Sequence, residues 1–377
     1  MCIRTWYIFL ATAFSLLLGL VQVGYGQRIY ADAQQPSNTA LASVSGAGNA
    51  VDLPDTTNYS TLNVTLGIGG LIHAQQNLQF VNNPKPSIYS PVVAKIGSNS
   101  SLLTLLGGFV IQRTNGGINS LVAPSYSVSE LLNLLQLLGG NTTGNVVFPP
   151  TGNSFDGIRF EVNSLLGIGI TARYYYAFYI VPPTVSESDI TLCQGATQSI
   201  TISNFQTYTP YTYRFYNSRI GGVQIDMDVT TSTFTIPANW EGSYWLEARE
   251  HNAYPSARTE IKIIRNKISG GIISGDQTIC EGDNPVMING SLPDETTVGA
   301  TIVYQWQKNT SGTYETIVGA TTQNYLPIAS AETAKYQRKV TSTLNGTVCE
   351  SLSNEITITV KPKPPAPNIE LHPNSQY

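Results

Sequence analysis

Two stretches of the chain share one pattern, Asp189-Ile-Thr-Leu-Cys193-Gln-Gly195 and Asp276-Gln-Thr-Ile-Cys280-Glu-Gly282. Each is followed by a short run in which apolar residues alternate with others. Further blocks recur in the same order in both copies: Tyr213-Arg-Phe215-Tyr with Tyr304-Gln-Trp306-Gln, Tyr244-Trp-Leu-Glu-Ala248 with Tyr336-Gln-Arg-Lys-Val340, and Glu260-Ile-Lys-Ile-Ile264 with Glu355-Ile-Thr-Ile-Thr359. Matching positions lie 87 to 95 residues apart. A repeat of this length, built from short strands and turns, is typical of tandem β-sandwiches. We therefore expect an all-β protein with two tandem Ig-like domains.

Proline-rich and glycine-rich segments mark the expected domain ends. The Tyr-rich run 174–181 is typical of a closing strand, and Pro182-Pro183 ends it because proline has no amide hydrogen for a strand ladder. A second break falls between Arg265 and Gly271, and a third begins at Pro362 with a stiff proline-rich spacer. The expected division is a signal peptide over 1–26, an N-terminal β-sandwich domain over 27–181, Ig-like domains over 182–265 and 266–361, and a Pro-rich linker or tail over 362–377.

The first residues have the layout of a secretory signal peptide. Arg4 gives a positive start, an apolar run extends from Ile8 to Val23, and small residues precede a cut ahead of Gln27. A retained membrane anchor is the alternative. We expect export to the cell surface or medium, an oxidising location in which disulfides form.

Composition excludes some classes of partner. Charged residues make up 12% of the chain, against about 25% in typical soluble proteins. The net charge is −4 and cations are scattered singly, so nucleic-acid binding, which needs clustered cations, is not expected.

The apolar run Leu131–Leu138 follows a capping motif at Ser127-Val-Ser-Glu130. This run is too short for a membrane span of about 20 residues, and none is expected after signal cleavage.

The repeats resemble the Ig-like repeats of secreted adhesin-like proteins from gliding and related bacteria of the Bacteroidetes type. The matching motifs are Cys280-Glu-Gly282, Tyr304-Gln-Trp306, Ile317-Val-Gly-Ala-Thr321, Tyr336-Gln-Arg-Lys and Cys349-Glu-Ser351. The resemblance implies a disulfide between Cys280 and Cys349 and places Trp306, with Phe215 in the first copy, in the cores. Because the first copy has Tyr254-Pro-Ser256 where the second has Cys349-Glu-Ser351, Cys193 is expected to be an unpaired buried thiol. A reactive thiol or an intermolecular bridge at Cys193 is the alternative.

The N-terminal region holds a second resemblance. Residues 49–60 resemble the loop that opens galactose-binding-like jelly rolls of the discoidin and carbohydrate-module type, in which an Asp holds a structural calcium. Here Asp52 and Asp55 are the expected oxygen ligands, and no other cofactor is expected. Leu53 replaces the usual glycine of that loop, and an Asx-type turn around the two aspartates is the alternative.

The sequence holds few of the patterns that carry catalysis. None of its three histidines lies in a zinc-protease motif, and neither a nucleophile elbow nor a phosphate-binding loop occurs. We therefore expect a non-enzymatic adhesin-like protein, with the Ig-like repeats as a stalk and residues 27–181 as a recognition head for a surface glycan or protein. The first alternative is a carbohydrate-binding module protein that stacks sugars on Tyr59, Tyr89 or Tyr126. The second is a polysaccharide-active hydrolase with paired carboxylates.

Overall fold

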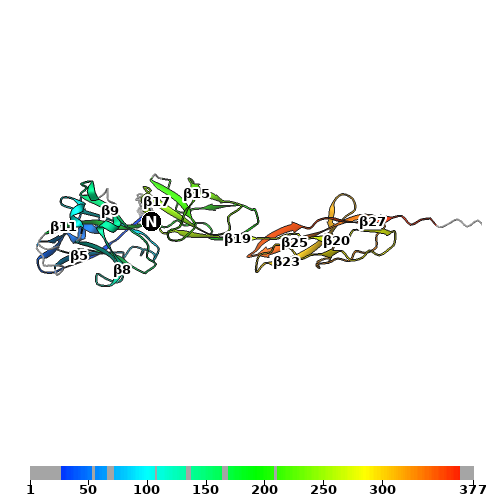
Figure 1. Cartoon of the computed structure of the whole chain (residues 1–377), viewed down its shortest axis with the longest axis horizontal. Coiled ribbons are helices and arrows are strands. Elements are labelled where there is room, and N and C mark those ends of the chain that lie inside the picture. The colour runs from blue at the N-terminus through cyan, green and yellow to red at the C-terminus, as the bar shows by residue number, and fades with distance from the viewer. Residues whose placement is uncertain are drawn as a thin grey trace, which may run out of the picture. The chain divides into compact units, whose positions relative to one another are not determined.

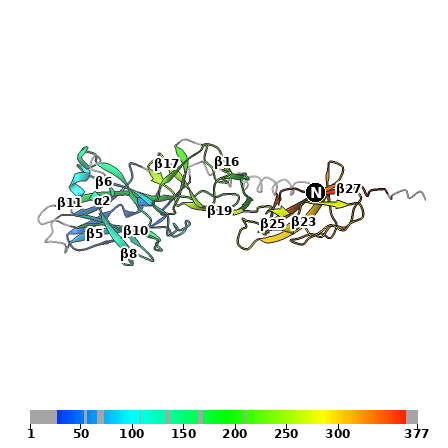
Figure 2. The same ribbon diagram turned by 45° about the vertical axis from the view of Figure 1, so that its right-hand side comes forward.

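A computed structural model describes residues 27–52, 56–65, 72–106, 108–132, 137–163, 169–207 and 210–365 (Figure 1; Figure 2). The expected signal peptide, Asp55 and most of the expected tail lie outside these ranges. The described chain is mostly strands joined by turns and loops, and its helical segments are short; they include η1 (Ala47–Ala50), η2 (Leu102–Leu105) and α2 (Val128–Leu131). The all-β fold class expected from the sequence is confirmed.

The N-terminal part is a sandwich of two sheets. The first has the order β3-β4-β11-β6-β9, with β1 on β11: β3 (Ala42–Ser45), β4 (Ser60–Val64), β11 (Ile170–Ile180), β6 (Val92–Ser98), β9 (Thr143–Phe148) and β1 (Arg28–Tyr30). The second has the order β2-β5-β10-β7-β8: β2 (Ala33–Asn38), β5 (His73–Gln79), β10 (Gly157–Asn163), β7 (Phe109–Thr114) and β8 (Leu121–Ser127). One apolar cluster contains residues of both sheets, so the sheets share a core. We call this sandwich the head.

Alternation along the strands decides which side chains fill that core. In β5, Ala74 and Leu78 are fully buried in the core cluster, and Gln75 and Asn77 therefore point to the opposite face. In β10, Ile158, Phe160 and Val162 face inward in the same way. The capping motif expected before the Leu-rich run is present, because the backbone N–H of Ser127 donates to the Glu130 carboxylate at 2.7 Å at the start of α2.

The middle sandwich contains the first copy of the sequence repeat. Its larger sheet has the order β12-β19-β17-β14-β15, with β18 on β17, and β13 pairs with β16 in a second sheet. The strands are β12 (Asp189–Cys193), β13 (Gln198–Thr201), β14 (Tyr211–Tyr216), β15 (Gln224–Val229), β16 (Thr233–Ile236), β17 (Gly242–Glu250), β18 (Tyr254–Pro255) and β19 (Thr259–Asn266). Phe215 is fully buried.

The last sandwich repeats this arrangement. Its larger sheet has the order β21-β27-β25-β23-β24, with β26 on β25, and β20 pairs with β22. The strands are β20 (Ile273–Ser274), β21 (Gln277–Cys280), β22 (Asn289–Gly290), β23 (Thr301–Asn309), β24 (Tyr314–Thr316), β25 (Ala334–Leu344), β26 (Thr347–Leu352) and β27 (Ile356–Lys361). In both copies the first strand of the sheet runs parallel to the last, β12 to β19 and β21 to β27. Trp306 is fully buried in the core of this sandwich and stacks on Tyr325.

Contacts between residues divide the chain into two compact units. One contains residues 1–186, 200–234 and 243–261, and the other contains residues 187–199, 235–242 and 262–377. The head lies wholly in the first unit. Strand β12 and the end of β19 belong to the same unit as the last sandwich.

The disulfide differs from the one expected. Cys193 at the end of β12 is bonded to Cys349 in β26, with Cα atoms 5.6 Å apart, and Cys280 is a free, exposed thiol. The expected pair, Cys280 with Cys349, and the expected unpaired Cys193 are therefore wrong. Cys349 pairs with Ser342 near the end of β25, whereas β27 beside Cys280 pairs with the start of that strand. The two thiols are thus separated by at least eight strand positions, about 26 Å, which no disulfide spans.

Candidate functional site

A row of polar side chains crosses the second sheet of the head. The register joins Gln35 of β2 to Asn77, Asn77 to Arg159, Arg159 to Gln112, and Gln112 to Ser125 of β8. Residues joined by register lie on the same face, and this face is opposite to the one that fills the core. We call these five residues the polar row. Beside it runs a second row, made of Ser37, Gln75, Glu161, Val110 and Ser127.

The middle of the polar row is buried although it lies on the outer face. Gln35 and Ser125 at the two edges are exposed, whereas Asn77 is 0% and Arg159 is 8% exposed. Arg159 forms a salt bridge to Glu161, with Nη2 and Oε2 2.9 Å apart, and the same Oε2 accepts a hydrogen bond from Gln75. The hydroxyl of Thr114 donates to Oδ1 of Asn77 at 2.8 Å, which directs the amide nitrogen away from Thr114.

Two donors in the row have no hydrogen-bond partner in the protein. They are Nδ2 of Asn77 and Nε of Arg159, both buried, and they belong to residues paired directly across β5 and β10. A buried donor left unpaired costs about 1–3 kcal/mol. Two such donors side by side, next to the Glu161 acceptor, form a pattern that hydroxyl or carbonyl oxygens of a ligand would complete. Both nitrogens are covered by protein in this structure, so a ligand oxygen would reach them only after the side chains over the polar row move aside.

The residues expected from the sequence to form the site are arranged differently. Asp52 is exposed and Asp55 lies outside the described residues, so the calcium site stays a prediction. No group of three or more His, Cys, Asp or Glu side chains suited to a metal occurs among the described residues.

The three tyrosines expected to stack on sugars already contact protein side chains. The Tyr59 ring lies 5.2 Å from Tyr175, the Tyr89 ring lies 4.7 Å from the guanidinium of Arg219, and Tyr126 lies edge-on to Phe148. The polar row was not among the expected sites. Its signal in the sequence is the polar alternation of β5 and β10, but only the cross-strand register joins the strands into one row.

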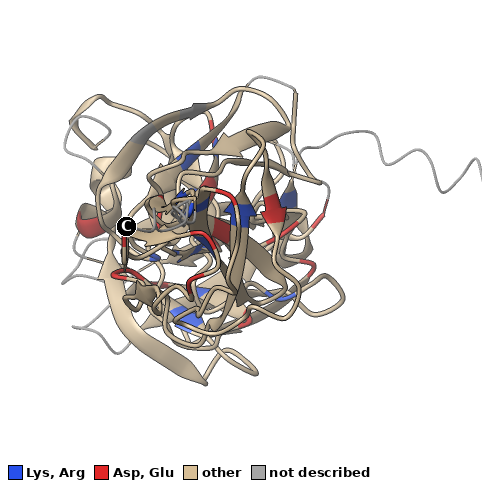
Figure 3. Ribbon diagram, turned by 90° about the vertical axis from the view of Figure 1, so that its right-hand side faces the viewer, with Lys and Arg blue, Asp and Glu red and all other residues tan. Residues whose placement is uncertain are grey.

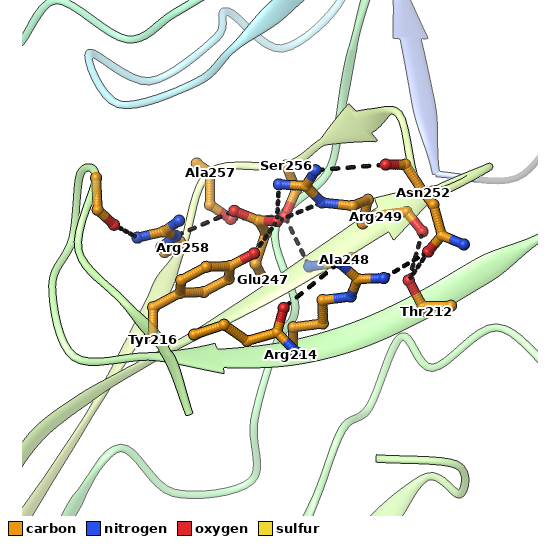
Figure 4. A network of polar contacts seen from close by, with 12 residues as sticks. Thr212, Arg214, Tyr216, Glu247, Ala248, Arg249, Asn252, Ser256, Ala257 and Arg258 are labelled. Atoms are coloured by element: carbon orange, nitrogen blue, oxygen red, sulfur yellow. Dashed lines mark hydrogen bonds and ion pairs between the residues drawn. The ribbon is translucent and has the colours of Figure 1, made fainter. Parts of the chain in front are cut away.

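A second polar network lies in the middle sandwich and has a structural role (Figure 4). Glu247 is 3% exposed and accepts hydrogen bonds from Arg249, Arg258 and Tyr216. Arg258 also donates to the carbonyl oxygen of Ser218, and its guanidinium lies 3.4 Å from the Tyr216 ring centre. Both carboxylate oxygens of Glu247 have protein partners, so this cluster links β17 to β14 and to the segment that contains Arg258.

The same sandwich has a depression of about 410 Å³ at the start of β14. Its polar groups are mostly satisfied within the protein: Tyr213 accepts a hydrogen bond from the backbone N–H of Gln206, and Arg214 donates to Asn252. The Phe205 and Tyr213 rings stack on each other at 4.6 Å. One lining group, the buried hydroxyl of Tyr211, has no hydrogen-bond partner, whereas the polar row has two unpaired donors.

Charge is sparse and mixed on the described chain. Lys and Arg segments are interspersed with Asp and Glu segments, and most of the ribbon carries neither (Figure 3). Among the described residues, no helix has the length and apolar character that would cross a membrane.

Comparisons with known proteins identify one domain family and several distant structures. Residues 269–362 match a domain family of unknown function, DUF8696, which covers the last sandwich. No curated protein matches the chain.

The similar solved structures are remote. They include a β-1,2-glucanase from Parabacteroides distasonis (11% identity, 90% of this chain and 40% of that one, TM-score 0.30). They also include a fragment of titin (14% identity, 76% of this chain and 99% of that one, TM-score 0.27) and the adhesin domain of Lys-gingipain from Porphyromonas gingivalis (8% identity, 39% and 97%, TM-score 0.22). The chain spans about two fifths of the length of the glucanase. At these scores the likenesses carry no argument about function.

Proposed function

We propose that this chain is an exported, non-enzymatic surface protein whose head recognises a glycan through the polar row and whose Ig-like sandwiches serve as a stalk. The observation that carries the proposal is the pair of unpaired buried donors, Asn77 Nδ2 and Arg159 Nε, beside the Glu161 carboxylate. On binding, the side chains that cover the two donors move aside, and a sugar hydroxyl then accepts from either donor and donates to the carboxylate. Neutral, hydroxyl-rich ligands therefore match this arrangement of donors and acceptors.

The proposal includes a domain division and a topology for the head. Signal peptide 1–26, head 27–181, Ig-like domains 182–265 and 266–361 and tail 362–377 are retained as its parts. We assign the head a jelly-roll topology. This is supported by the order β4-β11-β6-β9 in one sheet and β5-β10-β7-β8 in the other, in which every connection from β4 to β11 crosses between the sheets except β7 to β8.

The polar face favours binding over hydrolysis. Retaining and inverting glycosidases use two carboxyl groups on either side of the bond that breaks. Of the ten side chains in the polar row and the row beside it, Glu161 is the one carboxylate, and it is held by Arg159 and Gln75. A hydrolase would release reducing sugar from a bound polysaccharide, and we expect none.

A glycan array probed with residues 27–377 tests the proposal. The decisive variant is Asn77→Asp, which keeps the oxygen that accepts from Thr114 and replaces the unpaired donor with an acceptor. Loss of one neutral hydrogen bond, worth about 0.5–1.5 kcal/mol, predicts a Kd that is roughly two- to tenfold weaker, since 1.4 kcal/mol is a factor of ten. Arg159→Lys, which keeps the positive charge but has no Nε–H, is expected to weaken binding similarly.

The matched control is Asn153→Asp. It makes the same amide-to-carboxylate change at an exposed position of the head outside the polar row. Binding of this variant should equal that of the wild type. Absence of binding to any glycan, with or without calcium, or unchanged binding by a folded Asn77→Asp variant, refutes the proposal.

A further inference from the structure

We propose that Cys280 is the attachment point for a further Ig-like sandwich, which would be joined to this chain by the same kind of disulfide that Cys193 makes with Cys349. The partner is defined by its chemistry. It is an Ig-like sandwich that presents a β-hairpin with the sequence Asn-Gly-Thr-x-Cys, as residues 345–349 do here.

The observed joint shows what such a partner must supply. Cys349 lies two residues after Thr347, just beyond the tight turn between β25 and β26, in which Asn345 and Gly346 have φ of 48° and 80°. The side chain of Asn345 donates to the hydroxyl of Thr191 at 3.1 Å, and the hydroxyl of Thr347 donates to the carbonyl oxygen of Thr191 at 3.0 Å. The hairpin thus binds the end of β12 by two hydrogen bonds and one covalent bond.

Cys280 occupies the position of Cys193 in the second copy of the repeat. Each cysteine ends the first strand of its sheet, where that strand runs parallel to the last one: Cys193 is opposite Asn266, and Cys280 is opposite Lys361. After each cysteine the chain makes the same turn, with a carbonyl oxygen accepting from the residue three positions later, at 3.1 Å for Cys193 and 3.0 Å for Cys280.

The residue two positions before each cysteine is also the same. Thr191 precedes Cys193, and Thr278 precedes Cys280. Thr278 and Cys280 are both exposed, whereas Thr191 receives the hairpin and Cys193 is bonded to it. The end of the first strand is therefore bound by a hairpin in the first copy, whereas in the second copy it is exposed to solvent.

One contact of the joint differs between the copies. Asn266 is fully buried and donates to the carbonyl oxygens of Ser342 and Thr347, both at 3.0 Å. The corresponding residue is Lys361, which is exposed and cannot form this pair of bonds with an amide. We therefore expect the second joint to form more slowly than the first, and the change Lys361→Asn to speed its formation.

Formation of the bond is an oxidation. The Cys280 thiol and the partner thiol each lose one proton and one electron as the S–S bond forms. A disulfide oxidant such as oxidised glutathione takes up both electrons and both protons and becomes two thiols. An oxidising compartment outside the cytoplasm favours this reaction.

The test uses the full chain with a second copy of residues 267–361 placed directly after Lys361. The extended chain is refolded in a glutathione buffer, free thiols are alkylated, and the disulfide peptides are identified by mass spectrometry. The expected result is a peptide that joins Cys280 to the cysteine of the added copy that corresponds to Cys349, beside the original pair Cys193 with Cys349. The added copy's own equivalent of Cys280 should be the alkylated thiol.

Two variants distinguish a disulfide that depends on docking of the hairpin from one that forms only because both thiols lie on the same chain. In the extended chain, changing the added copy's threonine, the equivalent of Thr347→Val, removes a docking hydrogen bond and should slow formation of the new bond at least threefold. Cys280→Ser should leave the added cysteine free. The proposal is overturned if Cys280 is alkylated while Cys193 and Cys349 are joined, in the parent extended chain and in its Lys361→Asn form alike. It is also overturned if the threonine change leaves the rate unaltered.

Discussion

Replacing Glu247 with Gln removes the charge at the centre of the buried polar network of the middle sandwich. The Glu247 side chain is 3% exposed, and its two guanidinium partners, Arg249 and Arg258, are 23% and 11% exposed. The substitution keeps the size of the side chain and one carbonyl oxygen, but it turns an NH₂ group toward one of the arginines. Both arginines then remain in place without a counter-charge.

The expected loss follows from the burial of each partner. Breaking a buried ion pair by removing one member costs about 3–5 kcal/mol. Arg249 is partly exposed and can turn to water, and Arg258 keeps its bond to the carbonyl oxygen of Ser218 and its contact with the Tyr216 ring. These compensations favour the lower end, so the free energy of unfolding should fall by about 3 kcal/mol.

A matched control lies in the same sandwich. Glu260 forms an ion pair with Arg219 in which the two side chains are 37% and 39% exposed. Because exposed pairs contribute about 0–1 kcal/mol, Glu260→Gln should lower the stability by less than 1 kcal/mol. Urea unfolding followed by tryptophan fluorescence, with Trp306→Phe as the background so that Trp240 and Trp245 report on the middle sandwich, measures both variants, with an unchanged denaturant slope expected. If Glu247→Gln loses no more stability than Glu260→Gln, the structural role assigned to the network is refuted.

Three further predictions follow from the fold. Reduction of the disulfide between Cys193 and Cys349, 156 positions apart in sequence, should lower the free energy of unfolding by about 4–5 kcal/mol on the chain-entropy account; an unchanged urea midpoint with reductant would contradict it, and Cys280→Ser is the control. Burial raises the pKa of Tyr336 to about 12. The protonated Tyr336 hydroxyl therefore stabilises the fold fully below the ordinary tyrosine pKa of about 10, and this stabilisation is lost as the pH rises through 12. Tyr336→Phe should shift the alkaline unfolding transition to higher pH, and circular dichroism across pH 9–13 measures that transition. In Gly157→Ala, the added Cβ would lie 2.5 Å from Thr114 Oγ1 and 2.9 Å from Asn77 Oδ1. Displacement of the Asn77 amide should weaken glycan binding, measured by calorimetry, roughly two- to tenfold; equal affinity would show that this amide is not used.

The repeat and the fold class could be predicted from the sequence because they depend on local patterns. Each strand of the sandwiches is short and alternating, and the aromatic positions Phe215 and Trp306 recur at the same place in both copies. The two side chains are indeed fully buried. A pattern of this kind can be recognised in the sequence without knowing which strand pairs with which.

The disulfide and the polar row could not be predicted in the same way. With three cysteines in the described chain, the choice of pair depends on where each strand end lies, and the bond joins the two copies rather than closing one of them. The polar row depends on register across five strands, so Asn77 and Arg159, far apart in sequence, become neighbours only in the folded sheet. Burial of Asn77 on an outer face likewise has no signature in a single strand.

The signal of the Arg159 Nε–H group tests the central claim most directly. Arginine labelled with ¹⁵N in residues 27–377 gives this resonance, and Arg159→Lys, which lacks the group, assigns it. On saturation with a glycan that binds on the array, the account predicts that the Arg159 Nε–H resonance moves downfield and that its proton exchanges more slowly with water, as an oxygen acceptor reaches it. An unchanged Arg159 resonance in the fully bound protein would contradict recognition through the polar row.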